Sequence, residues 1–149
     1  MMIKYIAGAC IISAGVIVGN SINLIYKDRI CVLKRFYDFV MFCENEINFY
    51  KTEMCTIIEK FRENSHKFDK IIFEKENTFL IKGENALMIK NFFRQITELD
   101  SDSQKYYFSD IKTKTKRLIE EAEKDANVNG KMFKRLTPIL ALGITVLTL

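Results

Sequence analysis

Two hydrophobic patterns follow one another in the first third of the chain. Residues 3–25 are almost all apolar or small, and after Lys27, Asp28 and Arg29 the apolar positions recur in steps of three and four. No Pro or Gly lies between residues 21 and 62, which predicts one continuous helix that leaves a membrane and enters a soluble domain with a single buried seam. The seam comprises Leu33, Phe36, Tyr37, Val40, Cys43, Ile47, Tyr50, Met54, Ile57, Ile58 and Phe61.

Polar turns divide the middle of the chain. Residues 64–69 predict a turn that contains the only histidine, His66, which we interpret as an incidental exposed side chain. Residues 70–82 fit either a short hairpin or a broken helix, and their helical neighbours favour the helix. Gly83 ends this segment, and residues 84–99 then carry apolar side chains at helical spacing, namely Leu87, Met88, Phe92, Ile96 and Leu99.

A second long helix is predicted at the end of the soluble part. The sequence Asp100-Ser101-Asp102-Ser103 is rich in cap residues and starts a helix over roughly residues 103–136. One of its faces is apolar, and the other faces carry Lys, Glu and Asp. Because both long helices run from the same membrane surface, they should pair antiparallel. The apolar face comprises Tyr107, Ile111, Leu118, Ile119, Ala122 and Ala126.

Apolar runs at both ends predict membrane anchors. The first run reaches the length of about 20 residues that crosses a bilayer, and no small-x-small cleavage site closes it. Cleavage near Asn20 would instead give a secreted helical protein. The closing run from Pro138 is only some 20 Å long as a helix, so it either spans a thinned bilayer or packs beside the first anchor as a hairpin. Gly15 and Gly19 have the spacing of closely paired membrane helices.

These patterns predict an all-α protein, a membrane-anchored antiparallel helical bundle with long first and last helices. Its expected parts are an N-terminal transmembrane helix (1–26), a cytoplasmic helical domain (27–130) and a short C-terminal membrane segment (131–149). The middle is placed in the cytoplasm by the positive-inside rule, because cations flank it on both sides. Those cations are Lys27, Arg29, Lys34, Arg35, Lys131, Lys134 and Arg135.

Charge and motifs exclude several function classes. The net charge is only +4 and the signs are mixed, so we predict no nucleic-acid binding. The chain has no nucleophilic triad, no phosphate loop, no dinucleotide fingerprint and no His-Glu-x-x-His motif, so we predict no enzymatic activity, cofactor or small-molecule substrate. Glu44 and Glu46 face different directions on a helix, which is poor geometry for acid/base catalysis. The four cysteines form no metal-ligand pair, so we predict reduced thiols and no metal site.

The cations Lys112, Lys114, Lys116 and Arg117 form a basic run on the last helix. Such a run fits a solvated face, and it also fits a docking surface for an acidic partner.

Three stretches of the chain resemble the stage III sporulation protein AB family of endospore-forming bacteria. The C-terminal stretch Asn129-Gly130-Lys131-Met132-Phe133-Lys134-Arg135-Leu136 is similar to the family's Gly/Glu-Lys-Met-Tyr-Arg-Ser-Leu, and the stretch Glu44-Asn45-Glu46-Ile47-Asn48-Phe49 to its Glu-x-Glu-Ile-x-Tyr. Thr97 stands where the family has Gly, Pro138 lies in the closing segment, and the proline-containing loop expected after Phe49 is absent. The third stretch matches in spacing at Glu84, Asn85, Met88, Ile89, Phe92, Ile96, Asp100 and Gln104.

The resemblance implies a platform subunit of the channel-like complex between mother cell and forespore. It implies a domain similar to those of type II secretion inner-membrane platform proteins, and as partners a secretion-type ATPase, the sporulation AA protein, and other membrane subunits. It would place the chain in the mother-cell membrane around the forespore. The predicted contact residues are Glu44, Glu46, Asp100, Gln104, Lys112 and Lys116. The alternative is a membrane-tethered coiled-coil regulator or adaptor that dimerises through its first cytoplasmic helix, with the seam exposed on each protomer.

Overall fold

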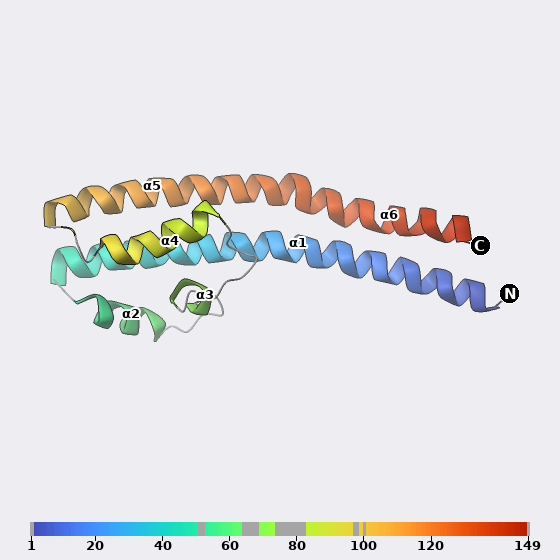
Figure 1. Cartoon of the computed structure of the whole chain (residues 1–149), viewed down its shortest axis with the longest axis horizontal. Helices are drawn as coiled ribbons and strands as arrows, with labels where there is room; N and C mark the ends of the chain where they lie inside the picture. The colour runs from blue at the N-terminus through green and yellow to red at the C-terminus, as the bar shows by residue number, and fades with distance from the viewer. Residues whose placement is uncertain are drawn as a thin grey trace. The chain divides into compact units, whose positions relative to one another are not determined.

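The chain is all-α. The computed structural model describes residues 2–50, 53–63, 69–73, 83–96, 99 and 101–148, and these contain no strand. The long first and last helical segments run antiparallel, as predicted (Figure 1). The elements are α1 (Met2–Asn45), the π-helical turn η1 (Glu46–Tyr50), α2 (Met54–Arg62), α3 (Asp69–Phe73), α4 (Glu84–Gln95), α5 (Ser101–Asp125), the π-helical turn η2 (Ala126–Gly130) and α6 (Lys131–Thr148).

The chain divides into two compact units. The terminal unit joins Met1–Asp28 to Ala122–Leu149, and the central unit is Arg29–Glu121. The unit boundaries follow Asp28 and Glu121. Within the terminal unit, the turns after Ala122 pack on the N-terminal half of α1: a Cβ on Gly130 would lie 3.1 Å from Oδ1 of Asn23.

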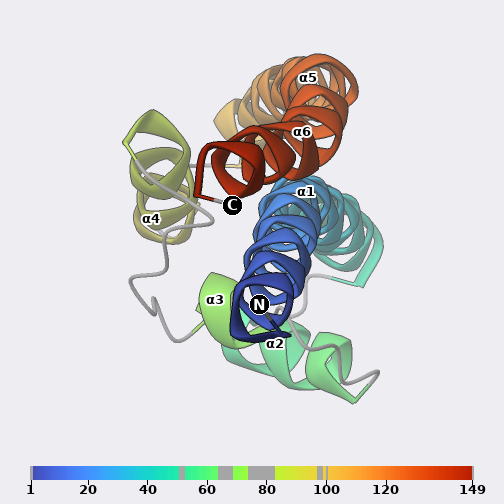
Figure 2. The same ribbon diagram turned by 90° about the vertical axis from the view of Figure 1, so that its right-hand side faces the viewer.

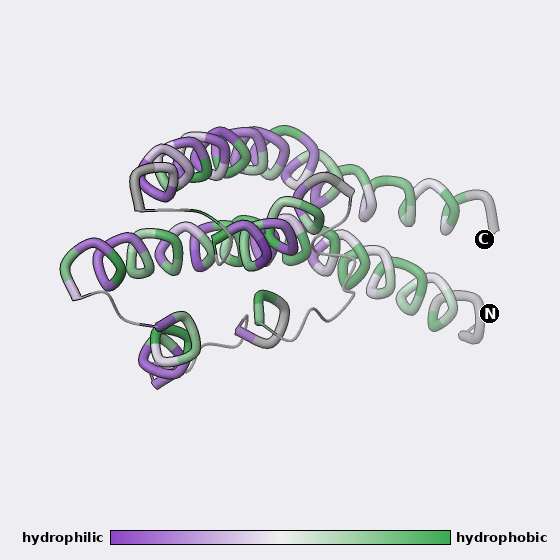
Figure 3. Tube along the Cα trace, turned by 60° about the vertical axis from the view of Figure 1, so that its left-hand side comes forward, coloured by the Kyte–Doolittle hydropathy of each residue, from purple (hydrophilic) through white to green (hydrophobic). Residues whose placement is uncertain are grey.

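Small residues form the helix contact within the terminal unit. A Cβ on Gly8 would lie 2.7 Å from Cγ2 of Thr145, and one on Gly15 would lie 2.6 Å from Cβ of Ala141. As the residue numbers of the glycines in α1 increase, the residue numbers of their neighbours in α6 decrease. The two helices therefore pair antiparallel. Side chains pointing away from this contact are apolar and exposed, and both terminal segments are mostly green in Figure 3.

The N-terminal helix is long and apolar enough to cross a membrane. By length and composition, the segment Ile6–Tyr50 contains a candidate membrane span, of which 11% is buried within the chain. Within the described residues no other helix meets the same test of length and composition. The closing helix α6 has 18 residues, about 27 Å, and three cations near its start.

The prediction of one uninterrupted helix to Arg62 is wrong. The first helix ends in η1, and α2 begins at Met54 after Glu53, whose backbone is extended (φ −67°, ψ 146°). The two helices fold against each other, since the Phe39 and Phe61 rings lie 5.1 Å apart. The C-terminal part of the predicted seam therefore belongs to a second helix that packs on the first.

An aromatic cluster holds the central unit together. Phe39 of α1 lies within 6.1 Å, between ring centroids, of Phe61 on α2, Phe73 on α3 and Phe92 and Phe93 on α4. Phe92 in turn contacts Tyr107 and Phe108 on α5. In Figures 1 and 2, α5 lies on one side of α1, and α2 and α3 lie on the opposite side. All five helices of this unit thus share one core, with α1 at its centre.

The predicted faces match much of this core. Leu33, Phe36, Val40 and Cys43 on α1 are fully buried, as expected of the seam, and Ile111 and Ala122 on the last helix are nearly so. The patterns omitted four residues that are also fully buried: Val32, Phe39, Phe108 and Thr115. His66 and residues 74–82 lie outside the described residues, and residues 69–73 form helix α3, the helical alternative for that part.

Candidate interaction surface

Two of the predicted contact residues bind each other. The Lys112 ammonium on α5 donates to both carboxylate oxygens of Glu44 on α1, at 2.8 and 2.7 Å. Both side chains are about three-quarters buried, so the pair lies in a partly desolvated position between the two helices. Glu44 and Lys112 therefore join two helices of the bundle, and the pairing sets their relative register.

Glu46 and Gln104 also have partners within the chain. Lys60 of α2 donates to Glu46 at 2.9 Å, which joins η1 to α2. Glu44 and Glu46 thus face different helices, as their spacing predicts. The Gln104 amide donates to the carbonyls of Ile96 and Leu99 at 3.1 and 3.0 Å and closes the C-terminal end of α4. Asp100 lies outside the described residues, and Lys116 is exposed on α5.

A groove of about 460 Å³ lies between α4 and α5, in the central unit. The interhelical packing that forms it includes Phe92 of α4, whose ring stacks on that of Tyr107 at a centroid distance of 6.0 Å. Of the basic run on α5, Lys114 and Arg117 line the groove, whereas Lys112 and Lys116, the two members predicted as contact residues, do not. The α4 residues on its wall include Asn85, Leu87, Met88, Asn91 and Gln95.

The Tyr107 hydroxyl has an unusual environment in this groove. Its oxygen is buried and has no hydrogen-bond partner among the residues that the structure describes. Burial, with a smaller contribution from the nearby Asp110 carboxylate, raises the pKa of Tyr107 to about 12. The phenol therefore stays neutral at physiological pH and keeps its capacity to donate.

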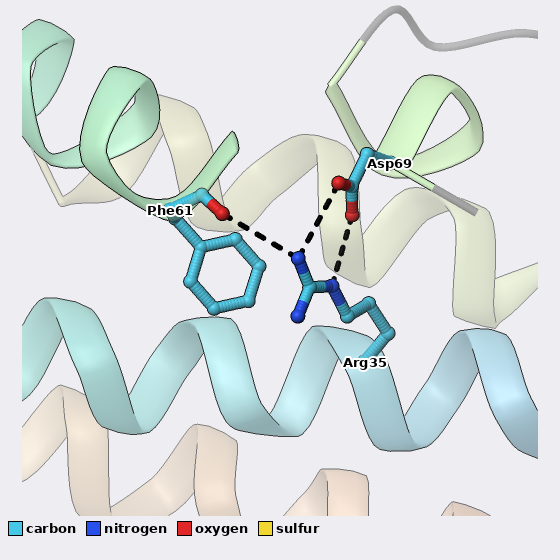
Figure 4. Close-up of polar contacts among 3 residues, drawn as sticks. All are labelled: Arg35, Phe61 and Asp69. Atoms are coloured by element: carbon cyan, nitrogen blue, oxygen red, sulfur yellow. Dashed lines mark hydrogen bonds and ion pairs between the residues drawn. The ribbon is translucent and has the colours of Figure 1, made fainter. Parts of the chain in front are cut away.

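A buried ion pair joins three helices of the central unit. The guanidinium of Arg35 on α1 donates to both carboxylate oxygens of Asp69 on α3, at 2.9 and 3.3 Å, and to the carbonyl of Phe61 on α2 at 3.5 Å (Figure 4). It also lies 3.9 Å from the centroid of the Phe61 ring. Arg35 therefore fixes α2 and α3 on α1, and the sequence interpretation of its charge as part of a membrane-flanking cluster missed this role.

Removing Asp69 should destabilise the central unit. Asp69→Ala leaves the partly buried Arg35 guanidinium without its carboxylate, and we expect a loss of about 2–3 kcal/mol in the free energy of unfolding, measured by urea titration in detergent micelles. The matched control is Asp110→Ala, which removes a half-exposed carboxylate from its pair with Lys114 one turn away. That change should cost no more than about 0.5 kcal/mol. Equal losses in the two variants would contradict a structural role for the Arg35 pair.

A second hollow, of about 380 Å³, lies along η2 and α6. Asn127, Lys131 and Arg135 line it at intervals of four residues, beside the apolar side chains Val128, Met132 and Leu136. It is a shallow strip along one helical segment and belongs to the terminal unit.

The part of the chain that the structure describes contains no cluster of three or more His, Cys, Asp or Glu side chains that could hold a metal ion. The four thiols are free, with Cys43 buried in the core and Cys10, Cys31 and Cys55 exposed. The central unit presents a groove and charged side chains on α5.

Comparison of the chain with protein-family models, with curated proteins and with solved structures gave no match. The structure therefore defines the class of protein. It is an all-α chain that has, among its described residues, one helix long and apolar enough to cross a membrane, together with a separate helical unit.

Proposed function

We propose that this chain is a non-enzymatic membrane platform subunit, in which a helical hairpin anchors a cytoplasmic helical domain that docks other proteins. The observation that carries this proposal is the division into two units of opposite surface character. The terminal unit exposes Val16, Ile17 and Val18 on α1 and Ile139, Leu140 and Val146 on α6. The central unit instead has a buried aromatic core and, among its described residues, exposes fewer large apolar side chains, namely Met41, Phe49, Tyr50, Leu87 and Tyr106.

The terminal unit has polar groups suited to a lipid environment. The hydroxyls of Ser13, Ser21 and Thr145 each donate to the carbonyl four residues earlier, at 2.8–2.9 Å. A hydroxyl satisfied by its own helix can enter the hydrocarbon region without an unpaired donor. The glycine contacts let the two backbones approach closely, which favours α6 as the second leg of a hairpin inserted with α1.

Burial of the seam favours the platform over the dimerising adaptor. An adaptor that dimerises through its first cytoplasmic helix needs the Val40–Phe61 part of the seam exposed on the free protomer. Val40, Cys43 and Ile57 are fully buried within one chain and Phe61 is nearly so, whereas Tyr50 is 73% exposed. Opening the bundle to free them would expose the whole aromatic core of the central unit, so that mode of dimerisation has a large energetic cost.

The assignment of this platform to a particular complex and membrane rests on the resemblance to the stage III sporulation protein AB family. In this proposal the platform belongs to the mother cell–forespore channel of endospore formation and lies in the mother-cell membrane around the forespore. Its partners are the secretion-type ATPase of that complex and the other membrane subunits, and ATP hydrolysis belongs to the ATPase.

The test is binding of the full chain, in phospholipid nanodiscs, to the companion secretion-type ATPase purified from the same organism. We expect saturable binding, which empty nanodiscs do not show. A matched control is the full chain with Phe39→Ala, assayed at a temperature between the melting temperatures of the variant and the unchanged chain, where the central unit of the variant is unfolded and the hairpin residues are unchanged. Binding that is equal with and without a folded central unit, or no binding at all, would overturn the ATPase-docking assignment.

A further inference from the structure

We propose that the groove between α4 and α5 binds an acidic amphipathic helix of a partner protein. The inference deepens the proposed function, since it assigns the surface on which a platform subunit would hold its partner. It rests on three features of the groove: apolar side chains from both helices, two cations in its lining, and the Tyr107 hydroxyl, which has no partner among the described residues.

The groove has apolar side chains from both of its helices. Leu87 and Met88 of α4 and Ile111 and Leu118 of α5 line it, together with amide and cationic side chains. Leu87 is 57% exposed, so the groove presents apolar surface to the solvent. A helix laid between two helices buries such surface with side chains one and two turns apart, and this is a recurrent mode of peptide recognition.

The charge of the groove selects the partner. Lys114 and Arg117 line it, and no Asp or Glu does so among the described residues. Each cation pairs with a carboxylate on its own helix, Asp110 at 2.6 Å and Glu121 at 3.5 Å, and all four side chains are more than half exposed. Exposed pairs of this kind are weak and exchange readily, so carboxylates of a docked helix can replace Asp110 and Glu121.

The Tyr107 hydroxyl adds an independent observation. A buried hydroxyl without a partner among the described residues is unfavourable in the free protein. Because the oxygen is buried, a carboxylate or an amide of a docked helix reaches it only if the Tyr107 side chain turns outward, and the complex would then supply the missing hydrogen bond. The Tyr107 hydroxyl therefore lowers the stability of the free chain and would increase the affinity for the partner helix.

The experiment uses the full chain in nanodiscs and two synthetic helical peptides of about 18 residues, which as helices are longer than the 12-residue α4. Both carry leucines at positions i, i+3, i+4 and i+7; one has glutamates flanking the leucines and the other has lysines. The companion ATPase is a third probe. The double variant Lys114→Glu/Arg117→Glu is compared with Lys90→Glu/Lys105→Glu, which makes the same change in net charge at exposed cations outside the groove.

We expect the acidic peptide to bind at least tenfold more tightly than the basic peptide. The groove double variant should lose this preference, and the control double variant should keep it. Tyr107→Phe should weaken binding of the acidic peptide several-fold and, in the free chain, leave the melting temperature unchanged or raise it. That combination separates a binding role from a structural one, because loss of a structural hydrogen bond would lower the melting temperature.

Each other outcome is decisive. Equal binding of the two peptides, or equal effects of the two double variants, would overturn the groove assignment. If Lys116→Glu reduced ATPase binding while the groove variant did not, the contact would lie on the exposed face of α5 and the groove proposal would fall, with the platform function intact. Binding of the acidic peptide in the groove without any binding of the ATPase would keep the groove and overturn the ATPase as partner. Cross-linking between two chains at Leu87→Cys would identify a second copy as the occupant and refute a separate partner.

Discussion

Replacing Phe39 with alanine should cost about 3–5 kcal/mol in the free energy of unfolding of the central unit. The ring is fully buried and contacts aromatic side chains on α2, α3 and α4, so its loss leaves a cavity that three helices would have to close together. Domains of this size have a total stability of about 5–15 kcal/mol. The expected fall in melting temperature is roughly 15–30 °C, measured by circular dichroism of the full chain in detergent micelles.

The control for this prediction is Phe49→Ala. Phe49 lies in η1, ten positions after Phe39, and is 78% exposed. Its removal should change the free energy of unfolding by less than about 0.5 kcal/mol, as for most surface substitutions. If the two variants melted at the same temperature, the aromatic cluster around Phe39 would not be the core of the unit.

Replacing Gly15 with leucine should separate α6 from α1. A Cβ at this position already lies 2.6 Å from Cβ of Ala141 and 3.2 Å from the carbonyl oxygen of Thr137, so a larger side chain forces the helices apart. The readout is a disulfide between Gly8→Cys and Thr145→Cys, in a chain whose four native cysteines are serine. These two positions are in contact across the helix pair.

We expect efficient oxidation of this cysteine pair in membranes and a yield several-fold lower when Gly15→Leu is added. Gly143→Leu is the matched control, since nothing lies within 4 Å of a Cβ at Gly143. It adds the same side chain to the same helix pair and should leave the yield unchanged. Equal yields in both variants would contradict close packing of α1 on α6 in the membrane.

The sequence predicts the helices better than it predicts where they end. The apolar stripe from Leu33 to Cys43 identifies a buried face, because its period is that of a helix packed on one side. Ile57 and Phe61 continue the same period, so periodicity cannot distinguish a helix that continues from one that folds back. Neither Pro nor Gly lies at that break, and the usual signal of a helix end is therefore missing.

The sequence patterns did not predict most of the contacts between helices. Phe39 lies beside the predicted stripe, and it became the centre of the core because α2, α3 and α4 all pack around it. The Glu44–Lys112 pair joins residues 68 positions apart, and its geometry depends on the register of two helices. Gly15 and Gly19 are different, since their spacing alone predicted close packing, and the structure places both against α6.

The residues that line the candidate groove were also not predictable from the sequence pattern alone. The basic run from Lys112 to Arg117 indicated a charged face on the last helix, but only the packing of α4 separates its members. Lys112 turns toward Glu44, Lys116 is exposed, and Lys114 and Arg117 line the groove. The sequence pattern identified a basic helix, and the tertiary structure separates the cations that line the groove from those that do not.

The most direct test of the account is the side of the membrane on which the central unit lies. Cys31 and Cys55 are exposed on that unit, and Cys43 is buried in its core. In cells that produce the full chain, a membrane-impermeant maleimide should label Cys31 and Cys55 only after the membrane is permeabilised. Labelling of both cysteines in intact cells would place the central unit outside and contradict a cytoplasmic platform, and so would release of the chain from membranes by alkaline carbonate.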